Sequence, residues 1–218
     1  MEVEYCGHSY FLLRVKGKLV AVDPHDGGSI NVPTCRVGAD YVLVTHDHYD
    51  HNAVEVAMGR DTRVYRQRLG SFALDDIHVR GVRVYHDKSG GRLRGWVAAY
   101  IIDSGDLKLA HLGDIGDPAP DTLGELRGAD VVFLPVGGVY TIDAQEAWEL
   151  VEELKPRIAV PMHYWIKGST LPLDPLDRFL NIARAPRIVV ETGRATISRE
   201  TLPEKTSIMV FRYPPRAQ

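Results

Sequence analysis

The feature that most constrains this chain of 218 residues is a run of histidines and aspartates placed directly after an apolar segment. Residues 41–45 have the composition of a buried strand that ends abruptly in polar residues. Four side chains able to bind metal follow at once: His46, His48, Asp50 and His51. Alternate residues of an extended segment point the same way, so His46 and His48 can bind one ion. A turn would then bring Asp50 and His51 to a second ion nearby.

Three more candidate ligands stand just after predicted strands elsewhere in the chain. His86 follows the strand-like residues 79–85, Asp114 follows residues 107–112, and His163 follows residues 158–162. Loops at strand ends are where a rigid scaffold presents a site. The shared placement of these side chains, rather than any one of them alone, predicts a site for two divalent ions. Imidazole and carboxylate ligands suit Zn²⁺, and also Mn²⁺ or Fe²⁺.

The composition fits one globular domain, which we expect to span residues 1–218. Hydrophobic residues make up 44% of the chain and charged residues 25%, an ordinary balance for a folded protein. The net charge of −3 gives no electrostatic case for a nucleic-acid partner. No apolar run approaches the roughly 20 residues needed to cross a bilayer, so we expect no membrane association. The oligomeric state is left open.

The cysteines and the first residues give an expectation about the compartment. Cys6 and Cys35 are the only cysteines, too few for a disulfide framework, and we interpret them as core or loop residues. Residues 1–5 lack the basic start and apolar stretch of a signal peptide and are predicted to form the first strand. These observations favour a reducing cytoplasm.

Short strand-like runs dominate the first half of the chain, and helices alternate with strands in the second. Strands are predicted at residues 9–15, 18–22, 41–45, 62–66, 79–85, 96–103, 107–112, 131–135, 158–162 and 187–191. Helices are predicted at residues 144–154 and 174–183, and Asp143 with Glu146 forms a capping box for the first of them. This order fits sheets packed face to face with helices outside.

The run T-H-x-H-x-D-H at residues 45–51 resembles the signature of the metallo-β-lactamase superfamily. The resemblance covers nearly the whole chain, and it is strongest to the small single-domain branch that includes ascorbate-phosphate lactonase-like hydrolases. Less specific segments match this branch in order and spacing: residues 7–9, 23–24, 112–114, 134–138, 140–141 and 161–164.

The resemblance implies an α+β fold, a four-layer αββα sandwich with a dinuclear metal site at one edge. By motif position, the first ion would be held by His46, His48 and His86, and the second by Asp50, His51 and His163. Asp114 would bridge the two ions. Asp50 and Asp114 are expected to act in catalysis as well as in metal binding.

Three further residues are expected near the ligands, in contact with substrate or with the ligands themselves. His8 follows the first predicted strand, where a polar turn residue is the plain alternative, and Asp23 lies in a matching segment of the branch. His111 precedes Asp114 by three residues within a predicted strand, so alternation turns its side chain away from the face that Asp114 uses. The basic residues Lys88, Arg92 and Arg94 could contact an anionic substrate or belong to a solvated loop.

Two divalent ions that share a bridging water lower its pKa towards about 7, so hydroxide is available at neutral pH. We therefore expect a metal-dependent hydrolase of a small ester, lactone or phosphoester. The alternatives are a nuclease or phosphodiesterase acting on nucleic acid, and an iron-dependent redox enzyme. A metal-binding protein without activity is a further alternative, which the complete set of ligand positions disfavours.

Overall fold

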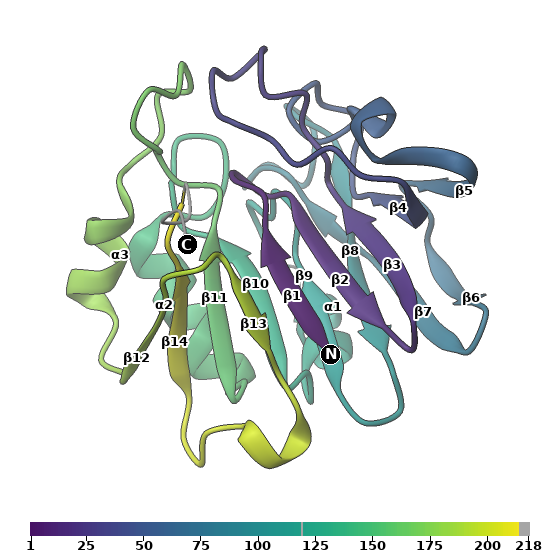
Figure 1. The fold of residues 1–218 in the computed structure, drawn as a ribbon. Helices are drawn as coiled ribbons and strands as arrows, with labels where there is room; N and C mark the ends of the chain where they lie inside the picture. Colours follow the sequence, from purple (N-terminus) through teal and green to yellow (C-terminus); the bar gives the residue numbers. More distant parts are fainter. Residues whose placement is uncertain (119, 214–218) are drawn as a thin grey trace.

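The computed structural model describes residues 1–118 and 120–213, which form two β-sheets stacked face to face (Figure 1). The first sheet has six strands in the order β13-β1-β2-β3-β4-β5. Its strands are β1 Glu2–Tyr5, β2 Phe11–Val15, β3 Lys18–Val22, β4 Ala39–Val44, β5 Met58–Arg66 and β13 Arg194–Thr196. The pairs β3·β4 and β4·β5 are parallel, and the other pairs of this sheet are antiparallel.

The second sheet has eight strands in the order β12-β14-β11-β10-β9-β8-β7-β6. Its strands are β6 Gly70–Leu74, β7 Ile77–Tyr85, β8 Trp96–Asp103, β9 Lys108–His111, β10 Val131–Pro135, β11 Ile158–Met162, β12 Arg187–Val190 and β14 Ser207–Phe211. Strands β9, β10, β11 and β14 run parallel, and β9 pairs with β8 in the antiparallel sense. The parallel strands are almost wholly apolar, as strands covered on both faces must be.

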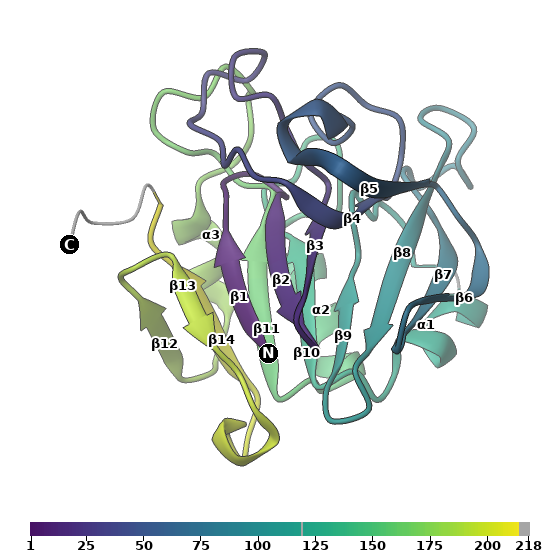
Figure 2. The same cartoon turned by 45° about the vertical axis from the view of Figure 1, so that its right-hand side comes forward.

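The helices α1 Pro120–Leu126, α2 Ala144–Leu154 and α3 Leu176–Ile182 lie on the outer side of the eight-stranded sheet (Figures 1 and 2). The predicted start of α2 is confirmed. The side chain of Asp143 accepts hydrogen bonds from the backbone of Gln145 and Glu146, and the Glu146 side chain accepts one from the Asp143 backbone. The apolar face that this cap orients carries the buried residues Trp148, Val151 and Leu154.

The main core lies between the two sheets, where the rings of Phe11 and Phe133 pack with their centroids 4.6 Å apart. A smaller apolar cluster joins strands of the six-stranded sheet to the segment after β4, where Val42 and Val44 pack with Val56 and Ala57. Val56 and Ala57 belong to η1 Val54–Ala57, a single 3-10 turn. The expected α+β sandwich is therefore confirmed, and the helical cover over its first sheet is short.

Parallel strands deliver their carboxyl ends to one edge of the sandwich, at the top of Figures 1 and 2. Strands β3 and β4 of the first sheet, and β9, β10 and β11 of the second, all end there. Strand β7 also ends at this edge, and the loops after β4, β7, β9 and β11 carry the predicted ligands. The fold thus collects at one edge side chains that are more than 100 residues apart in the sequence, such as His46 and His163.

Cys6 and Cys35 pack in the smaller apolar cluster, as the interpretation as core or loop residues expected, but the disulfide between them was not expected from the sequence. Cys6, just after β1, forms a disulfide with Cys35 across 29 positions of sequence. A disulfide between residues this far apart in the sequence can be recognised only when the structure places the 23–38 loop beside the end of β1. Among residues 1–118 and 120–213, no helix is both long and apolar enough to span a membrane.

Candidate metal centre

The first group of candidate ligands consists of His46, His48, His86 and Asp114, whose nitrogen and oxygen atoms lie within 4.8 Å of one another. The loop after β4 supplies His46 and His48, the loop after β7 supplies His86, and the loop after β9 supplies Asp114. His48 Nδ1 lies 3.0 Å from His46 Nε2 and 3.2 Å from His86 Nε2. His48 is the partly exposed member, and the other three are buried.

The second group consists of Asp50, His51 and His163, and it also contains His8. All four are buried. His51 Nε2 lies 3.6 Å from Asp50 Oδ2, and His8 Nε2 lies 3.0 Å from the same oxygen. Two hydrogen bonds hold the backbone of His8 in place: the His8 carbonyl accepts one from the Tyr5 hydroxyl and one from the His163 amide, each at 3.0 Å.

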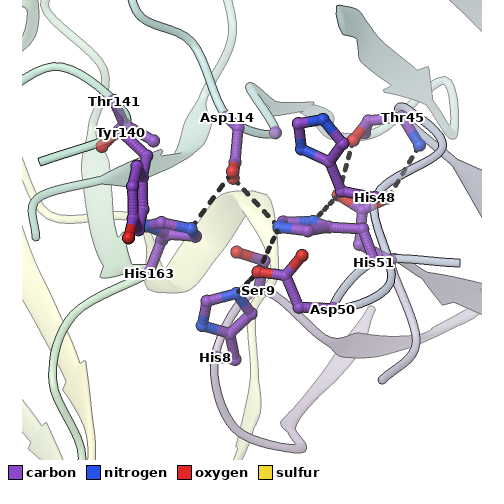
Figure 3. A network of polar contacts seen from close by, with 12 residues as sticks. His8, Ser9, Thr45, His48, Asp50, His51, Asp114, Tyr140, Thr141 and His163 are labelled. Carbon is purple, nitrogen blue, oxygen red and sulfur yellow. Dashed lines mark hydrogen bonds and ion pairs between the residues drawn. The ribbon is translucent and has the colours of Figure 1, made fainter. Parts of the chain in front are cut away.

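Asp114 contacts members of both groups, and Figure 3 shows its contacts with His51 and His163 of the second group. Its Oδ1 lies 3.1 Å from His51 Nε2, and its Oδ2 lies 3.1 Å from His163 Nε2. Oδ2 also lies 3.5 Å from His86 Nε2 and 3.8 Å from His46 Nε2. The structure therefore brings all seven predicted ligands close together, and Asp114 lies within contact distance of members of both sets that the resemblance implied.

Hydrogen bonds on the far nitrogens turn three of these imidazoles inward. His46 Nδ1 lies 2.9 Å from Thr45 Oγ1, and His86 Nδ1 lies 3.1 Å from the carbonyl of Tyr140. His51 Nδ1 lies 2.9 Å from Asp23 Oδ2, and Asp23 also accepts a hydrogen bond from the Thr45 hydroxyl at 2.7 Å. Such outer contacts fix the ring orientation and the tautomer of a metal-binding histidine, with its Nε2 lone pair facing the centre.

The donor set fits divalent ions. Two ligands on a tetrahedral zinc ion stand about 3.4 Å apart, given bond lengths near 2.1 Å. The contacts within each group match that spacing. His51 Nε2 and Asp114 Oδ1 lie 3.1 Å apart, yet both are buried with no hydrogen-bond partner among the described residues. Buried polar atoms without a partner are costly, and an ion between them would satisfy both.

Burial and neighbouring charge set the protonation states of the cluster. Burial lowers the pKa of His46 to about 3 and that of His8 to about 3, so both are neutral at neutral pH. The pKa of Asp114 lies well below its usual range, because His163 and His51 outweigh the burial that would raise it. Burial alone would lower the pKa of His51, but the adjacent carboxylates of Asp114 and Asp50 outweigh it and raise this pKa well above its usual value. Metal binding displaces such a proton.

Close packing of the loops depends on two glycines. A Cβ at Gly113, which has φ +54°, would lie 2.6 Å from Val97 and 2.7 Å from Thr45. A Cβ at Gly137 would lie 2.1 Å from the carbonyl oxygen of His163. Gly113 lets the loop that bears Asp114 lie directly against Thr45, next to the ligand His46, and Gly137 lets the loop after β10 lie directly against the backbone of the ligand His163.

His111 lies apart from the two groups, as strand alternation predicted. Its Nε2 lies 3.0 Å from the carbonyl of Ser9, and its Nδ1 accepts a hydrogen bond from the Gly113 amide at 3.2 Å. Both nitrogens therefore have partners in the backbone. His111 ties the start of β2 to the loop that carries Asp114.

A cavity of about 280 Å³ opens onto the cluster and reaches His48, Asp50, His86, Asp114 and His163. Its remaining walls come from Tyr49, Arg94, Tyr140 and Leu171. From the sequence, Leu171 could be placed only within the loop 165–172, one of those expected to shape the pocket, and Tyr140 only within a segment that matches the family. A larger cavity of about 550 Å³ beside α2 is lined by Glu146, Glu149 and Glu153 and contains none of the seven candidate ligands.

Comparison with known proteins places these features in a family. A profile described as a β-lactamase superfamily domain matches residues 2–163. A UPF0173 protein of Pyrococcus furiosus is 35% identical over 198 residues, covering 80% of this chain and 87% of its own. A UPF0173 metal-dependent hydrolase of Archaeoglobus fulgidus is 33% identical, covering 88% of this chain and 94% of its own.

Solved structures agree with the sequence relatives. A candidate zinc-dependent hydrolase of the metallo-β-lactamase superfamily from Thermotoga maritima superimposes with a TM-score of 0.77 and 28% identity. The match covers 97% of this chain and 99% of that one. A metallo hydrolase of the hyperthermophilic archaeon Ignicoccus hospitalis superimposes with a TM-score of 0.64 and 25% identity, covering 83% and 89%.

Proposed function

Because this chain belongs to the metallo-β-lactamase superfamily and is a metal-dependent hydrolase, we propose that it cleaves a small ester, lactone or phosphoester at the cavity beside Asp114. One observation carries the proposal. Two groups of imidazole and carboxylate ligands, all buried except the partly exposed His48, share the Asp114 carboxylate, and members of both line the same cavity. A shared carboxylate between two closely spaced ion sites is the arrangement that two-metal hydrolysis needs.

We assign two divalent ions to the centre, with zinc as the proposed metal. His46, His48 and His86 would hold the first ion, Asp50, His51 and His163 the second, and Asp114 both. The mixture of imidazole and carboxylate ligands supports zinc, while Mn²⁺ and Fe²⁺ accept the same ligands. When bound, the ions would supply a Lewis acid for the substrate oxygen and an activated water as the nucleophile.

The side chains of this protein would position the reacting groups. Asp114 is ionised and buried, so its oxygens can orient the attacking water as well as hold the ions. Asp23 fixes the ring of His51, and Thr45 fixes the ring of His46. We propose that His8, which contacts Asp50 Oδ2 at 3.0 Å, holds that carboxylate in the orientation needed by the second ion. His8 would thus act through Asp50 and not on the substrate.

The dimensions of the cavity support a small-molecule substrate. Its volume of about 280 Å³ lies just below the range of roughly 300–1,000 Å³ that is typical of small-ligand sites. The net charge of −3 adds no general attraction for a nucleic acid.

The proposal can be tested with purified protein stripped by a chelator and then reloaded with Zn²⁺, Mn²⁺ or Fe²⁺. Metal content and hydrolysis of a panel of aryl esters, lactones and phosphodiesters would be measured together. We expect hydrolysis that requires metal and is lost in His48→Ala. His78→Ala is the matched control, because His78 is an exposed residue of β7 outside the centre. A stripped protein that hydrolyses the panel at the reloaded rate would refute the proposal.

A further inference from the structure

The loop that follows His86 is shaped by a single carboxylate. Asp87 Oδ1 accepts hydrogen bonds from the amides of Ser89 at 2.8 Å and Gly91 at 3.2 Å. Asp87 Oδ2 accepts hydrogen bonds from the amides of Leu93 at 3.0 Å and Arg94 at 2.8 Å. The loop is also closed at its base, where the His86 amide donates to the carbonyl of Gly95 at 3.1 Å. The position of the Arg94 backbone is therefore fixed relative to His86.

The Arg94 side chain is directed to the cavity over the centre. Its guanidinium carbon lies 4.6 Å from the centroid of the Tyr140 ring, and both residues line the cavity. The Tyr140 carbonyl contacts His86 Nδ1 at 3.1 Å, so the backbone that carries the ring beneath the guanidinium is held next to a candidate ligand. When a guanidinium stacks on an aromatic ring, the contact is made by the flat face of the guanidinium, and its N–H donors, which point outward in its plane, can still bind another group.

The contacts of the Arg94 side chain differ from those of the other basic residues of this loop. Lys88 forms an ion pair with Glu146, and Arg92 donates to the carbonyl of Ser89 at 3.0 Å. Within residues 1–118 and 120–213, no carboxylate lies within ion-pair distance of the Arg94 guanidinium. Arg94 is also the only basic side chain, histidines apart, that lines this cavity among the described residues.

We propose that Arg94 binds an anionic group on the substrate, so that this hydrolase acts on small anionic esters, lactones or phosphoesters. This inference rests on the proposed hydrolytic function. The edge of the guanidinium offers paired donors to a carboxylate or phosphate. The walls formed by Tyr49, Tyr140 and Leu171 would contact the apolar part of the same molecule. Arg94 thereby selects the substrate, while the Asp114 centre cleaves it.

Two esters that share a leaving group test the proposal on the zinc-loaded protein. 4-Nitrophenyl butyrate is neutral, and the mono-4-nitrophenyl ester of glutaric acid carries a carboxylate at a similar length. Arg94→Gln is expected to lower kcat/KM for the glutarate ester by about 10-fold or more, through a higher KM, because a charge-assisted hydrogen bond is lost. Hydrolysis of the butyrate ester should change by less than about twofold, and Arg94→Lys should restore part of the loss.

Arg92→Gln is the matched control, since it removes one positive charge from the same exposed loop but lies outside the cavity. It should leave both esters unaffected. Equal losses for the two esters in Arg94→Gln would overturn the proposal, because they would show a general effect on the loop. The same conclusion follows if both arginine variants lose activity on the glutarate ester alike, because only the overall charge would then matter.

Binding of glutarate, measured by calorimetry on the zinc-loaded protein, separates this proposal from the hydrolytic one. Any contact of glutarate with the ions is common to both arginine variants, so only the contribution of Arg94 differs between them. Weaker binding by Arg94→Gln than by Arg92→Gln would uphold the anion site even if neither ester were cleaved. Equal dissociation constants would refute the anion site even if both esters were good substrates.

Discussion

The two halves of the metal centre differ in how they are enclosed. The group around His48 is open to the cavity, and His48 itself is partly exposed. In the group around His51 every member is buried, and His51 contacts the fully buried Asp23 on its far side. The first half also reaches Asp23, but only through the hydroxyl of Thr45. One half is therefore held by a charged neighbour and the other by a neutral one.

This difference in enclosure predicts different rates of ion exchange in the two halves. In the buried half, an ion would be held by two carboxylates, Asp50 and Asp114, and none of its ligands would be an exposed residue. In the open half, an ion would be held by three imidazoles and one carboxylate, and its ligand His48 is partly exposed at the cavity. We expect the second ion to exchange slowly and the first to exchange quickly with chelators in solution.

The largest effect is expected from Asp114→Ala, which should remove the distinction altogether. Since Asp114 contacts both groups, its loss should deplete both ions and lower hydrolysis by about 1,000-fold or more. Elemental analysis of the purified variant measures the metal content directly. Asp76→Ala, in an exposed turn, should retain full occupancy. Full occupancy in Asp114→Ala would show that the halves do not depend on a common ligand.

A pair of histidine variants should separate the halves. His48→Ala is expected to leave one slowly exchanging ion, and His163→Ala one that a chelator removes quickly. Either change should lower hydrolysis by about 100-fold or more, because two-metal chemistry needs both ions. Chelator competition followed over time measures the two rates. Equal rates in the two variants would mean that enclosure does not control exchange.

The outer contacts provide a finer test of the same comparison. Asp23→Asn should weaken metal binding by about 10- to 100-fold, mainly in the buried half, because His51 loses its charged partner. Thr45→Val should weaken binding by less than about 10-fold, and mainly in the open half, because it removes a neutral hydrogen bond to His46. A larger effect for Thr45→Val than for Asp23→Asn would reverse the ranking of the two supports.

The smallest effect on activity is expected from the disulfide. Replacing both Cys6 and Cys35 with serine should lower the free energy of unfolding by about 3–4 kcal/mol, the chain-entropy value for a loop of this length. The disulfide lies outside both ligand groups, so hydrolysis at room temperature should fall by less than about threefold. Urea unfolding and steady-state rates measure the two quantities. A large loss of activity in the folded variant would show that the Cys6–Cys35 disulfide positions His8.

Much of the fold and the ligand set could be predicted because the signals are local. A buried strand such as β4 or β11 is an apolar run that ends abruptly, and its following loop begins with a ligand. Strands β6, β13 and β14 and the helix α1 were not predicted. Strand β13 has three residues and β6 is mostly exposed, so neither carries a clear hydrophobic period.

The features that the sequence did not reveal depend on contacts between distant segments. The Cys6–Cys35 disulfide requires the 23–38 loop to fold back on β1. The cavity walls come from separate loops, which supply Arg94, Tyr140 and Leu171. The sequence favoured a solvated loop for Arg94, and only its stacking on Tyr140 and its place in the cavity wall distinguish it from Arg92. Side-chain chemistry could be read along the chain, whereas enclosure could not.

The ligands come from both sheets, and this arrangement has a consequence for heat resistance. His46 to His51 follow a strand of the six-stranded sheet, whereas His86, Asp114 and His163 follow strands of the eight-stranded sheet. Ions bound here would link the six-stranded sheet to the eight-stranded sheet, and they would bind only when both sheets are folded. A ligand that binds only the folded state adds about 2.7 kcal/mol at 100 times its dissociation constant. The melting temperature of this protein should therefore rise and fall with the free metal in its surroundings.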